Sequence, residues 1–330
     1  MPGEPGGIAI GLLGDVMLGR MVARALERQR PETLWAPELR DLAASLDLVV
    51  CNLECCISER GEPTELIDGK PFFFRGPPAA VDALKAMSIA VVGLANNHAL
   101  DYGGEALQDT LELLDRGGIT TAGAGLGLEA ARLPAVVTAA GVRVGVIAVA
   151  DHPAEYAAAP GRSGVAYAPM DDGEPAWLLE LVDAARARCG LVIAFPHWGP
   201  NMVTRPSRRQ ERIAASLHGA GADLVAGHSA HVFHGVGWDR GPTLFDLGDV
   251  LDDYRVDPAL RNDLGVFAIW RPHASPELEL VGLRLEHCCT RLASGVDSDW
   301  IASRLGRACR ELGTSVTRVG EQRFAVEPVA

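Results

Sequence analysis

Residues 8–20 read IAIGLLGDVMLGR, an apolar run that leads directly into a glycine and an aspartate. The part from Ile8 to Leu13 has the length and composition of a strand buried on both faces of a sheet. Further short apolar runs of this kind are Leu48–Cys51, Ala90–Leu94, Val142–Ala150, Leu191–Phe195 and Leu224–Ala226. Because helical patterns separate these runs, the sequence predicts an α/β fold with helices on the outer faces of its sheets.

The second half of the chain predicts a different kind of strand. Leu244–Leu247, Val266–Trp270 and Leu278–Leu285 are expected as strands with hairpin-like connections, which makes the sheet mixed. Two helix boundaries are also predicted. Gly117-Gly118 ends one helix, and Ser207 with Gln210 three residues later forms the capping box of another.

Three segments are predicted along the chain. Residues 1–7 form a disordered tail, residues 8–286 the main domain, and residues 287–330 a C-terminal α+β appendage packed on it. The appendage contains a helix from about Asp297 and a hairpin of Ser315–Val319 with Phe324–Val326. Ser58–Pro78 and Asp151–Tyr167 match neither helix nor strand, and loops of that length are usually functional or mobile.

The composition argues against several classes of protein and partner. Of the 330 residues, 48% are hydrophobic and 22% charged, which is ordinary for a globular protein. A net charge of −13 argues against nucleic acid and other polyanions, because a negative field repels them. The apolar runs are too short to span a bilayer and no secretory signal is visible, so we expect no membrane partner and a cytoplasmic location. Seven cysteines, an odd number, do not suggest a disulfide framework.

Polar side chains gather directly after the predicted strands, where α/β proteins build their sites. They are Asp15, Glu54, Asn97 with His98 and Asp101, His197, His228 with His231, and Asp249. Any one of them alone could be a helix cap or a hydrogen-bonded core residue. Together they offer carboxylate, amide and imidazole donors, a set that binds hard-to-borderline divalent metals. No thiolate lies at ligand spacing, which argues against a structural zinc site.

These motifs resemble the CapA-like proteins, a family named for poly-γ-glutamate capsule synthesis that has the calcineurin-like metallophosphatase fold. The resemblance covers about Ile8 to Asp263. It implies a four-layer α/β/β/α sandwich of two mixed sheets, with metal held at the strand ends. Carried across residue by residue, it implies that the metal ligands are Asp15, Glu54, Asn97, His197, His228 and His231. His98 matches the acid/base histidine of the broader fold.

The chain departs from the family pattern in three places. The broader fold opens with Asp-x-His, but Asp15 is followed by Val16-Met17. The pattern Gly-His-His-Pro-His becomes Gly-His-Ser-Ala-His over residues 227–231, and Gly-Asn-Phe becomes Gly-Asp-Val over residues 248–250. We therefore expect a divalent ion, with Mn, Ca, Mg and Zn all open, and leave open whether one or two ions bind.

The resemblance allows three functions. The first is a hydrolase, in which metal lowers the pKa of a water that attacks a phosphoester or an amide. The second is a capsule-type role in poly-γ-glutamate export. The third is epimerisation at the Cα of a C-terminal residue, as in the lasso-peptide epimerases among CapA-like proteins, where two side chains exchange the α-proton. A non-catalytic peptide-binding protein is a fourth alternative, and the retention of all six ligand types argues against it.

The acidic charge and the lack of an anchor favour the third function over the capsule role. We therefore expect a metal-dependent peptide epimerase whose substrate is a peptide, such as a ribosomal precursor peptide. The residues expected to be catalytic are His98, Asp101, His234 and Asp249. Those expected to contact the substrate are Arg20, Lys70, Arg75 and Trp198.

Overall fold

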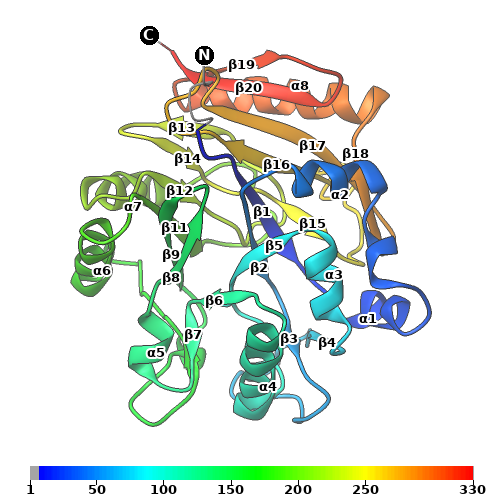
Figure 1. The fold of residues 1–330 in the computed structure, drawn as a ribbon, viewed down its shortest axis with the longest axis vertical. Helices are drawn as coiled ribbons and strands as arrows, with labels where there is room; N and C mark the ends of the chain where they lie inside the picture. The colour runs from blue at the N-terminus through cyan, green and yellow to red at the C-terminus, as the bar shows by residue number, and fades with distance from the viewer. Residues whose placement is uncertain (1–6, 330) are drawn as a thin grey trace.

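The computed structural model describes residues 7–329, and most of its strands belong to two sheets (Figure 1). The larger sheet has ten strands, with the central order β19-β20-β17-β16-β1-β2-β5-β6 and with β15 beside β1 and β18 beside β17. Their bounds are β1 Ile10–Val16, β2 Leu48–Leu53, β5 Ile89–Gly93, β6 Thr120–Ala122, β15 Asp249–Leu251, β16 Leu264–Trp270, β17 Leu278–Glu286, β18 Cys289–Leu292, β19 Thr314–Arg318 and β20 Arg323–Pro328. Strands β1, β2, β5 and β6 are parallel, whereas β16, β17 and β20 pair antiparallel. The predicted mixed α/β fold is confirmed.

The smaller sheet has six strands in the order β13-β14-β12-β11-β9-β8. They are β8 Ala135–Ala139, β9 Val142–Ala150, β11 Leu191–His197, β12 Leu224–Ala226, β13 Val236–Trp238 and β14 Pro242–Leu244. The four inner strands are parallel and the two edge strands pair antiparallel, so this sheet is also mixed. Two short pairs, β3 (Cys56–Ile57) with β4 (Arg75–Gly76) and β7 (Ala124–Gly125) with β10 (Gly164–Val165), lie outside both sheets.

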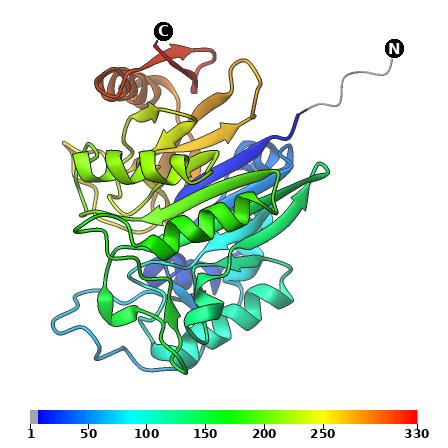
Figure 2. The same ribbon diagram turned by 90° about the vertical axis from the view of Figure 1, so that its left-hand side faces the viewer.

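The helices cover the sheets from outside. They are α1 Arg20–Leu26, α2 Pro37–Ala44, α3 Ala80–Ala86, α4 Gly103–Arg116, α5 Leu128–Arg132, α6 Ala176–Arg186, α7 Arg208–Gly219 and α8 Gly295–Glu311. Figure 2 shows α6 and α7 side by side over the smaller sheet. In Figure 1, α8 lies with β19 and β20 at the end opposite α4 and α5. None of the helices in the described part of the chain combines the length and the hydropathy that crossing a bilayer demands.

Strand β11 explains how the core is divided. Its residues Ile193 and Phe195 belong to a large apolar cluster shared with the ten-stranded sheet, while Val192 and Ala194 belong to a second cluster beneath α6 and α7. Alternate side chains of a strand point to opposite faces, so a strand covered on both sides has to be apolar throughout. This is the pattern that the short apolar runs predict.

The two sheets approach each other closely at Gly93, the last residue of β5. A Cβ atom added there would lie 3.0 Å from Cδ1 of Phe195 on β11. A side chain at this position would push the sheets apart just beside the ends of β5 and β11. The glycine therefore allows polar residues from both sheets to meet at one edge.

The expected capping box of α7 is confirmed, since the Ser207 hydroxyl accepts a hydrogen bond from the N–H of Gln210. The expected strand Leu244–Leu247 is wrong in its bounds, because β14 ends at Leu244. The chain turns there because the Asp246 carboxylate accepts hydrogen bonds from the N–H groups of Ala230 and Gly248, at 2.7 and 2.8 Å.

The C-terminal helix and hairpin are confirmed as α8, β19 and β20. Strand β20 pairs with β17 and β18 also pairs with β17, so this segment continues the ten-stranded sheet. A domain boundary between residues 286 and 287 stays a prediction. Of the predicted tail, residues 1–6 lie outside the described residues.

Candidate metal centre

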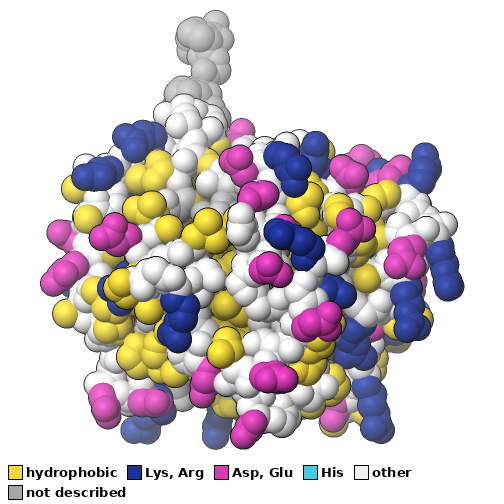
Figure 3. Space-filling model, turned by 90° about the horizontal axis from the view of Figure 1, so that it is seen from below, with side chains coloured by type: hydrophobic (Ala, Val, Ile, Leu, Met, Phe, Trp, Pro, Cys, Tyr) yellow, Lys and Arg dark blue, Asp and Glu magenta, His cyan; other side chains and the backbone are white. Residues whose placement is uncertain are grey.

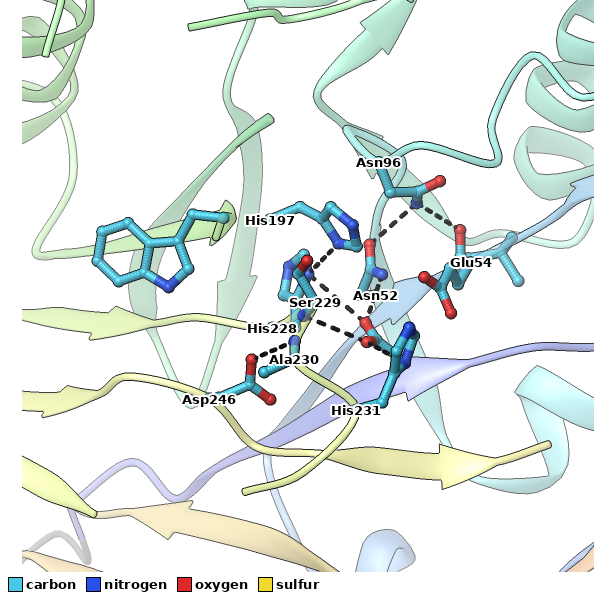
Figure 4. A network of polar contacts seen from close by, with 12 residues as sticks. Asn52, Glu54, Asn96, His197, His228, Ser229, Ala230, His231 and Asp246 are labelled. Atoms are coloured by element: carbon cyan, nitrogen blue, oxygen red, sulfur yellow. Dashed lines mark hydrogen bonds and ion pairs between the residues drawn. The ribbon is translucent and has the colours of Figure 1, made fainter. Parts of the chain in front are cut away.

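Two groups of potential metal ligands meet where the two sheets come together, and both contain Asp15. Asp15, His197 and His228 form one group, and Asp15, Glu54, His231 and Asp249 form the other. Within each group, one ligand atom from every residue lies within 4.8 Å of the others, and all six residues are buried. Figure 4 shows Glu54 after β2, His197 at the end of β11, and His228 and His231 in the connection after β12 converging on one place.

Strand register explains this convergence. Asp15 on β1 pairs with Asp249 on β15 and with Asn52 on β2, and Glu54 follows β2 directly. On the other sheet, His197 ends β11 and forms an isolated bridge with His228. Because the carboxyl ends of parallel strands lie at one edge, residues distant in sequence become neighbours here.

The loop between His228 and His231 has an unusual backbone. Ser229 has φ of 116° and His231 has φ of 59°, a region that residues with a Cβ rarely occupy. Such strain persists where the surrounding structure holds it in place, and it is frequent at functional sites. The Ser229 N–H donates to Asp15 Oδ2 at 3.3 Å, and the Nδ1 atoms of His228 and His231 both lie 3.6 Å from the Asp15 carboxylate.

Four buried polar atoms at this site have no hydrogen-bond partner, and they test whether the residues suit an ion. The atoms are Glu54 Oε1, Asn97 Oδ1, His228 Nε2 and Asp249 Oδ2. Unpartnered buried polar atoms are rare because burying them without a partner is costly. A cation would give these atoms the partner that the protein does not. The donor set therefore fits a divalent ion. Asn97, which the resemblance implies as a ligand, stays a predicted ligand.

Burial and the neighbouring charges shift the pKa values of the carboxylates and histidines in these groups. Burial, and then the neighbouring Asp15, raises the pKa of Glu54 well above its usual range, and burial with Asp252 does the same to Asp249. Burial lowers the pKa of His228 to about 3. The pKa of His231 is raised, because Glu54 and Asp15 together outweigh its burial. Ion binding would favour ionised carboxylates, so it is expected to release protons.

A chain of two asparagines supports the ligands, and the sequence analysis missed both. Asn52 Nδ2 donates to Asp15 Oδ1 at 2.7 Å, and Asn96 Nδ2 donates to Asn52 Oδ1 at 3.1 Å (Figure 4). Asn96 also accepts from the N–H of His98. Outer partners of this kind orient metal ligands and often matter nearly as much as the ligands. The signal was present, because each asparagine lies within two residues of a predicted ligand.

His98 and Asp101, both predicted as catalytic, are brought together beside the ligands. His98 Nδ1 lies 2.6 Å from Asp101 Oδ2, and the His98 ring stacks on Phe74 with centroids 3.9 Å apart. Asp101 is held in turn by the Tyr156 hydroxyl at 3.0 Å and by Lys70 Nζ at 3.2 Å. The Asp101 contact occupies Nδ1, so Nε2 is the His98 nitrogen available to a substrate.

A cavity of about 340 Å³ opens over His98 and His231. Its other lining residues are Arg20, Phe72, Phe74, Asn201, Met202, Tyr254, Arg255 and Asn262. The Tyr254 hydroxyl donates to Glu54 Oε2 at 3.1 Å, which links the cavity wall to the ligands. Two arginines and no carboxylate line this cavity, so it suits a substrate that carries carboxylates.

Of the four residues predicted to contact the substrate, only Arg20 lines this cavity. Lys70 contacts Asp101 and the carbonyl oxygen of Asn97, and Arg75 donates to the carbonyl oxygens of Arg60 and Gly61. Trp198 is buried and donates from Nε1 to the carbonyl oxygen of Phe245. Substrate contacts by these three residues stay predictions.

The other two residues predicted as catalytic are in different positions. Asp249 belongs to the ligand group and lies 2.8 Å from His231 Nδ1. His234 is buried outside both groups, with Nε2 3.0 Å from the carbonyl oxygen of Val203. Burial lowers the pKa of His234 to about 4.

A second histidine–aspartate pair, Asp151 with His152, lies beside the ligand His197. Its carboxylate contacts His152 Nδ1, and the His152 ring lies 5.3 Å from that of His197. Both residues line a separate cavity of about 720 Å³, which shares Asn201 with the first. They begin the segment Asp151–Tyr167 that matches neither helix nor strand, so only its length pointed to function.

Comparison with known proteins identifies the family of the chain. A family model described as bacterial capsule synthesis protein PGA_cap matches residues 9–254. A probable polyglutamine synthesis accessory protein of Mycobacterium tuberculosis is 30% identical over 381 aligned positions, which cover 100% of this chain and 98% of the relative. The PGA biosynthesis protein CapA of Bacillus subtilis is 26% identical, covering 74% of this chain and 63% of that protein. The chain therefore belongs to the bacterial capsule synthesis protein family PGA_cap, the CapA-like family that its motifs resemble.

Proposed function

We propose that this chain is a metal-dependent hydrolase that cleaves an amide bond in a carboxylate-rich peptide or polyglutamate-type chain. One observation carries the proposal: two ligand groups that share Asp15 lie beneath a cavity lined by His98, Arg20 and Arg255. Shared carboxylates are typical of two-metal hydrolases. The description of the family as capsule synthesis proteins, and the relatives' names, which refer to polyglutamine synthesis and PGA biosynthesis, support a polymer of this kind as the substrate.

Seven side chains would hold the ions: Asp15, Glu54, Asn97, His197, His228, His231 and Asp249. Bound there, a divalent ion would polarise the scissile carbonyl and lower the pKa of a water. Asp249 supplies the second group with a carboxylate from β15. The family has asparagine where this chain has Asp249. The added carboxylate would replace the ligand that is lost because the chain lacks the histidine of Asp-x-His, so a second ion could still be held.

The proposed hydrolysis gives His98 the task of moving a proton. As the water oxygen bonds to the carbonyl carbon, His98 Nε2 takes a proton from the water. The carbon–nitrogen bond then breaks, and the departing nitrogen takes that proton from His98 Nε2. Asp101 orients the ring through its contact with Nδ1. The stack with Phe74 on one face holds the imidazole at the cavity wall. A positioned acid of this kind contributes about 10²–10⁴-fold to rate.

The local charge of the cavity differs from that of the whole protein. The net charge of −13 argues against polyglutamate as a partner, but Arg255 and Arg20, the latter paired with Asp253, line the cavity, and none of its described lining residues is a carboxylate. On the face in Figure 3, acidic and basic side chains are interspersed rather than gathered by sign. Net charge therefore gives no reason to exclude a polycarboxylate at this site.

Epimerisation at a peptide Cα is a second candidate, and one observation favours it. Inversion needs proton-transferring groups on two sides of the reacting carbon. His98 with Asp101 and His152 with Asp151 flank the ligands from two cavities. A carboxylate-bearing ribosomal peptide would be the substrate of this reaction. Under either candidate we expect the protein to act in the cytoplasm. We also expect its sheets and helices to form the four-layer sandwich of the family.

Incubation in heavy water separates the two reactions. The purified protein, loaded with Mn²⁺ or Zn²⁺, is incubated with γ-linked glutamate oligomers and with candidate peptides, and the products are analysed by mass spectrometry and chiral chromatography. Hydrolysis yields shorter chains without deuterium at Cα. Epimerisation yields uncleaved peptide with one deuterium at Cα. If neither product forms, or if both form equally with His98→Gln, the proposed function is wrong.

A further inference from the structure

We propose that a line of arginines leading away from the candidate metal centre binds the distal part of a carboxylate-rich chain whose reacting bond lies at that centre. This line, the arginine track, consists of Arg20 and Arg255 in the first cavity and of Arg205, Arg304 and Arg307 in a neighbouring cavity of about 490 Å³. The inference rests on the proposed function, since it assigns the substrate an extended form and a path.

Two segments line both cavities and make them neighbours. Residues 201–205 supply Asn201 and Met202 to the first cavity, and Thr204 and Arg205 to the second. Residues 255–262 supply Arg255 and Asn262 to the first, and Ala259 and Leu260 to the second. A chain that leaves the metal centre between these segments therefore reaches the second cavity.

Hydrogen bonds hold the walls of this path in place. The carbonyl oxygen of Val203 contacts His234 Nε2 at 3.0 Å, which fixes the first segment to the body. Asn262 Oδ1 accepts from the N–H of Asp257 at 2.7 Å, which closes the second segment on itself. Arg304 Nη1 donates to the carbonyl oxygen of Leu260 at 3.0 Å, which joins that segment to α8. These hydrogen bonds therefore fix the two segments that form the walls of the path.

The track is positively charged and largely free of acidic partners. Among the described residues, Arg20 pairs with Asp253 at 3.3 Å, while Arg205, Arg255, Arg304 and Arg307 have no ion pair. Arg304 is only 8% exposed, and its Nη2 atom has no hydrogen-bond partner. Glu311 is the one carboxylate lining the second cavity. The Arg304 guanidinium lies 4.8 Å from the ring centroid of Phe233 and 5.4 Å from that of Trp300, so these rings hold it in place and its Nη2 atom is the group left for an anionic ligand.

The chemistry favours a chain of carboxylates over nucleic acid. Guanidinium groups bind carboxylates through paired, charge-assisted hydrogen bonds. The positive groups follow one narrow path, whereas the rest of a protein with net charge −13 repels the broad polyanionic surface of a nucleic acid. A flexible polymer with one carboxylate per residue can place successive groups on successive arginines.

Binding as a function of chain length tests the track. The Mn²⁺-loaded protein is titrated against fluorescein-labelled γ-linked glutamate trimer and dodecamer, with anisotropy as the readout and mass spectrometry to check that each probe stays intact. The double variant Arg205→Gln/Arg307→Gln and the single variant Arg307→Gln are compared with Arg310→Gln. Like Arg307→Gln, this control removes one positive charge from α8, but at a residue outside both cavity linings. Metal content and melting temperature of each variant confirm that it is folded and loaded.

We expect the dodecamer to bind wild type more tightly than the trimer does. The double variant should lose about tenfold in dodecamer affinity, with the trimer unchanged and Arg310→Gln unaffected. Equal affinities for the two lengths, an equal loss in Arg310→Gln, or equally tight binding of an oligonucleotide with the same charge would overturn the proposal. Binding requires no turnover, so the two proposals can fail separately. Length-dependent binding without any reaction would support the arginine track and contradict the proposed function.

Discussion

The ligand cluster and the cavity above it are built by different parts of the chain. All seven proposed ligands lie in a strand or within five residues of the end of one, where strand register positions them. The cavity is lined largely from long connections, such as the segment with Phe72 and Phe74 and the segment with Tyr254 and Arg255. Strand register is shared across a fold, whereas loop shape depends on local contacts. The candidate ion site therefore depends on the pairing of the sheets, whereas the shape of the cavity depends on connections that can change while the sheets stay the same.

The sharpest test of the cluster is Asp15→Asn, because Asp15 belongs to both ligand groups. We expect metal affinity to fall by at least about 100-fold and activity to disappear, with packing kept by the similar shape of asparagine. Elemental analysis and isothermal titration with Mn²⁺ measure the loss. Asp253→Asn, at a carboxylate that pairs with Arg20 and lies outside both groups, is the control. Equal metal content in Asp15→Asn and wild type would refute the cluster.

The next largest effect is expected at His98, which lies between the ligand cluster and the cavity. His98→Gln should lower kcat by about 10²–10³-fold while metal content stays at the wild-type level. Tyr156→Phe, which removes one hydrogen bond to Asp101, should have a much smaller effect. Turnover kinetics and elemental analysis on the same preparations measure both. Loss of metal in His98→Gln would show that His98 helps to hold the metal and is not a separate acid–base group.

Phe72 and Phe74 lie in the same segment, but Phe72 is exposed at the cavity and Phe74 is buried. Substituting each one separates the effect of the cavity wall from that of the core. Phe74 is 2% exposed, so Phe74→Ala should reduce the free energy of unfolding by about 3–5 kcal/mol. Phe72 is 55% exposed and lies near Arg20, so Phe72→Ala should change stability by less than about 0.5 kcal/mol and raise KM severalfold. Urea denaturation and steady-state kinetics measure the two effects. An unchanged KM in Phe72→Ala would remove it from the substrate wall.

The smallest expected effect concerns His234, whose position away from the ligand groups suggests a structural role. Burial lowers its pKa to about 4, so the unfolded chain takes up a proton before the folded protein does as the pH falls below about 6.5. Folding stability is therefore lost as pH falls between those values. His234→Gln should make that slope shallower by up to about 1.4 kcal/mol per pH unit. An unchanged slope together with lost activity would restore its predicted catalytic role.

The sequence predicted the ion site better than the cavity, and the reason is physical. Asp15, Glu54, His197 and His228 each follow an apolar run, and any parallel sheet brings such positions to one edge. Asn52 and Asn96 were missed because a supporting hydrogen bond depends on distances between strands. Lys70 was expected at the substrate, but its contact with Asp101 depends on how residues 58–78 fold back over the turn at Asn97. Loop conformation of this kind has no short-range sequence signal.

Strand β1 has a consequence for the synthesis of the protein. Its first part pairs with β16, at Ile10 to Leu12, and its last part with β15, at Asp15 and Val16. Both partners are made late, since β15 starts at Asp249 and β16 ends at Trp270. The first strand to leave the ribosome has an early neighbour in β2 on one side, but on its other side it waits for most of the chain, and pairing over such a sequence distance is slow. A nascent chain cut short before Asp249 would carry Asp15 and its histidine partners without β15 and β16.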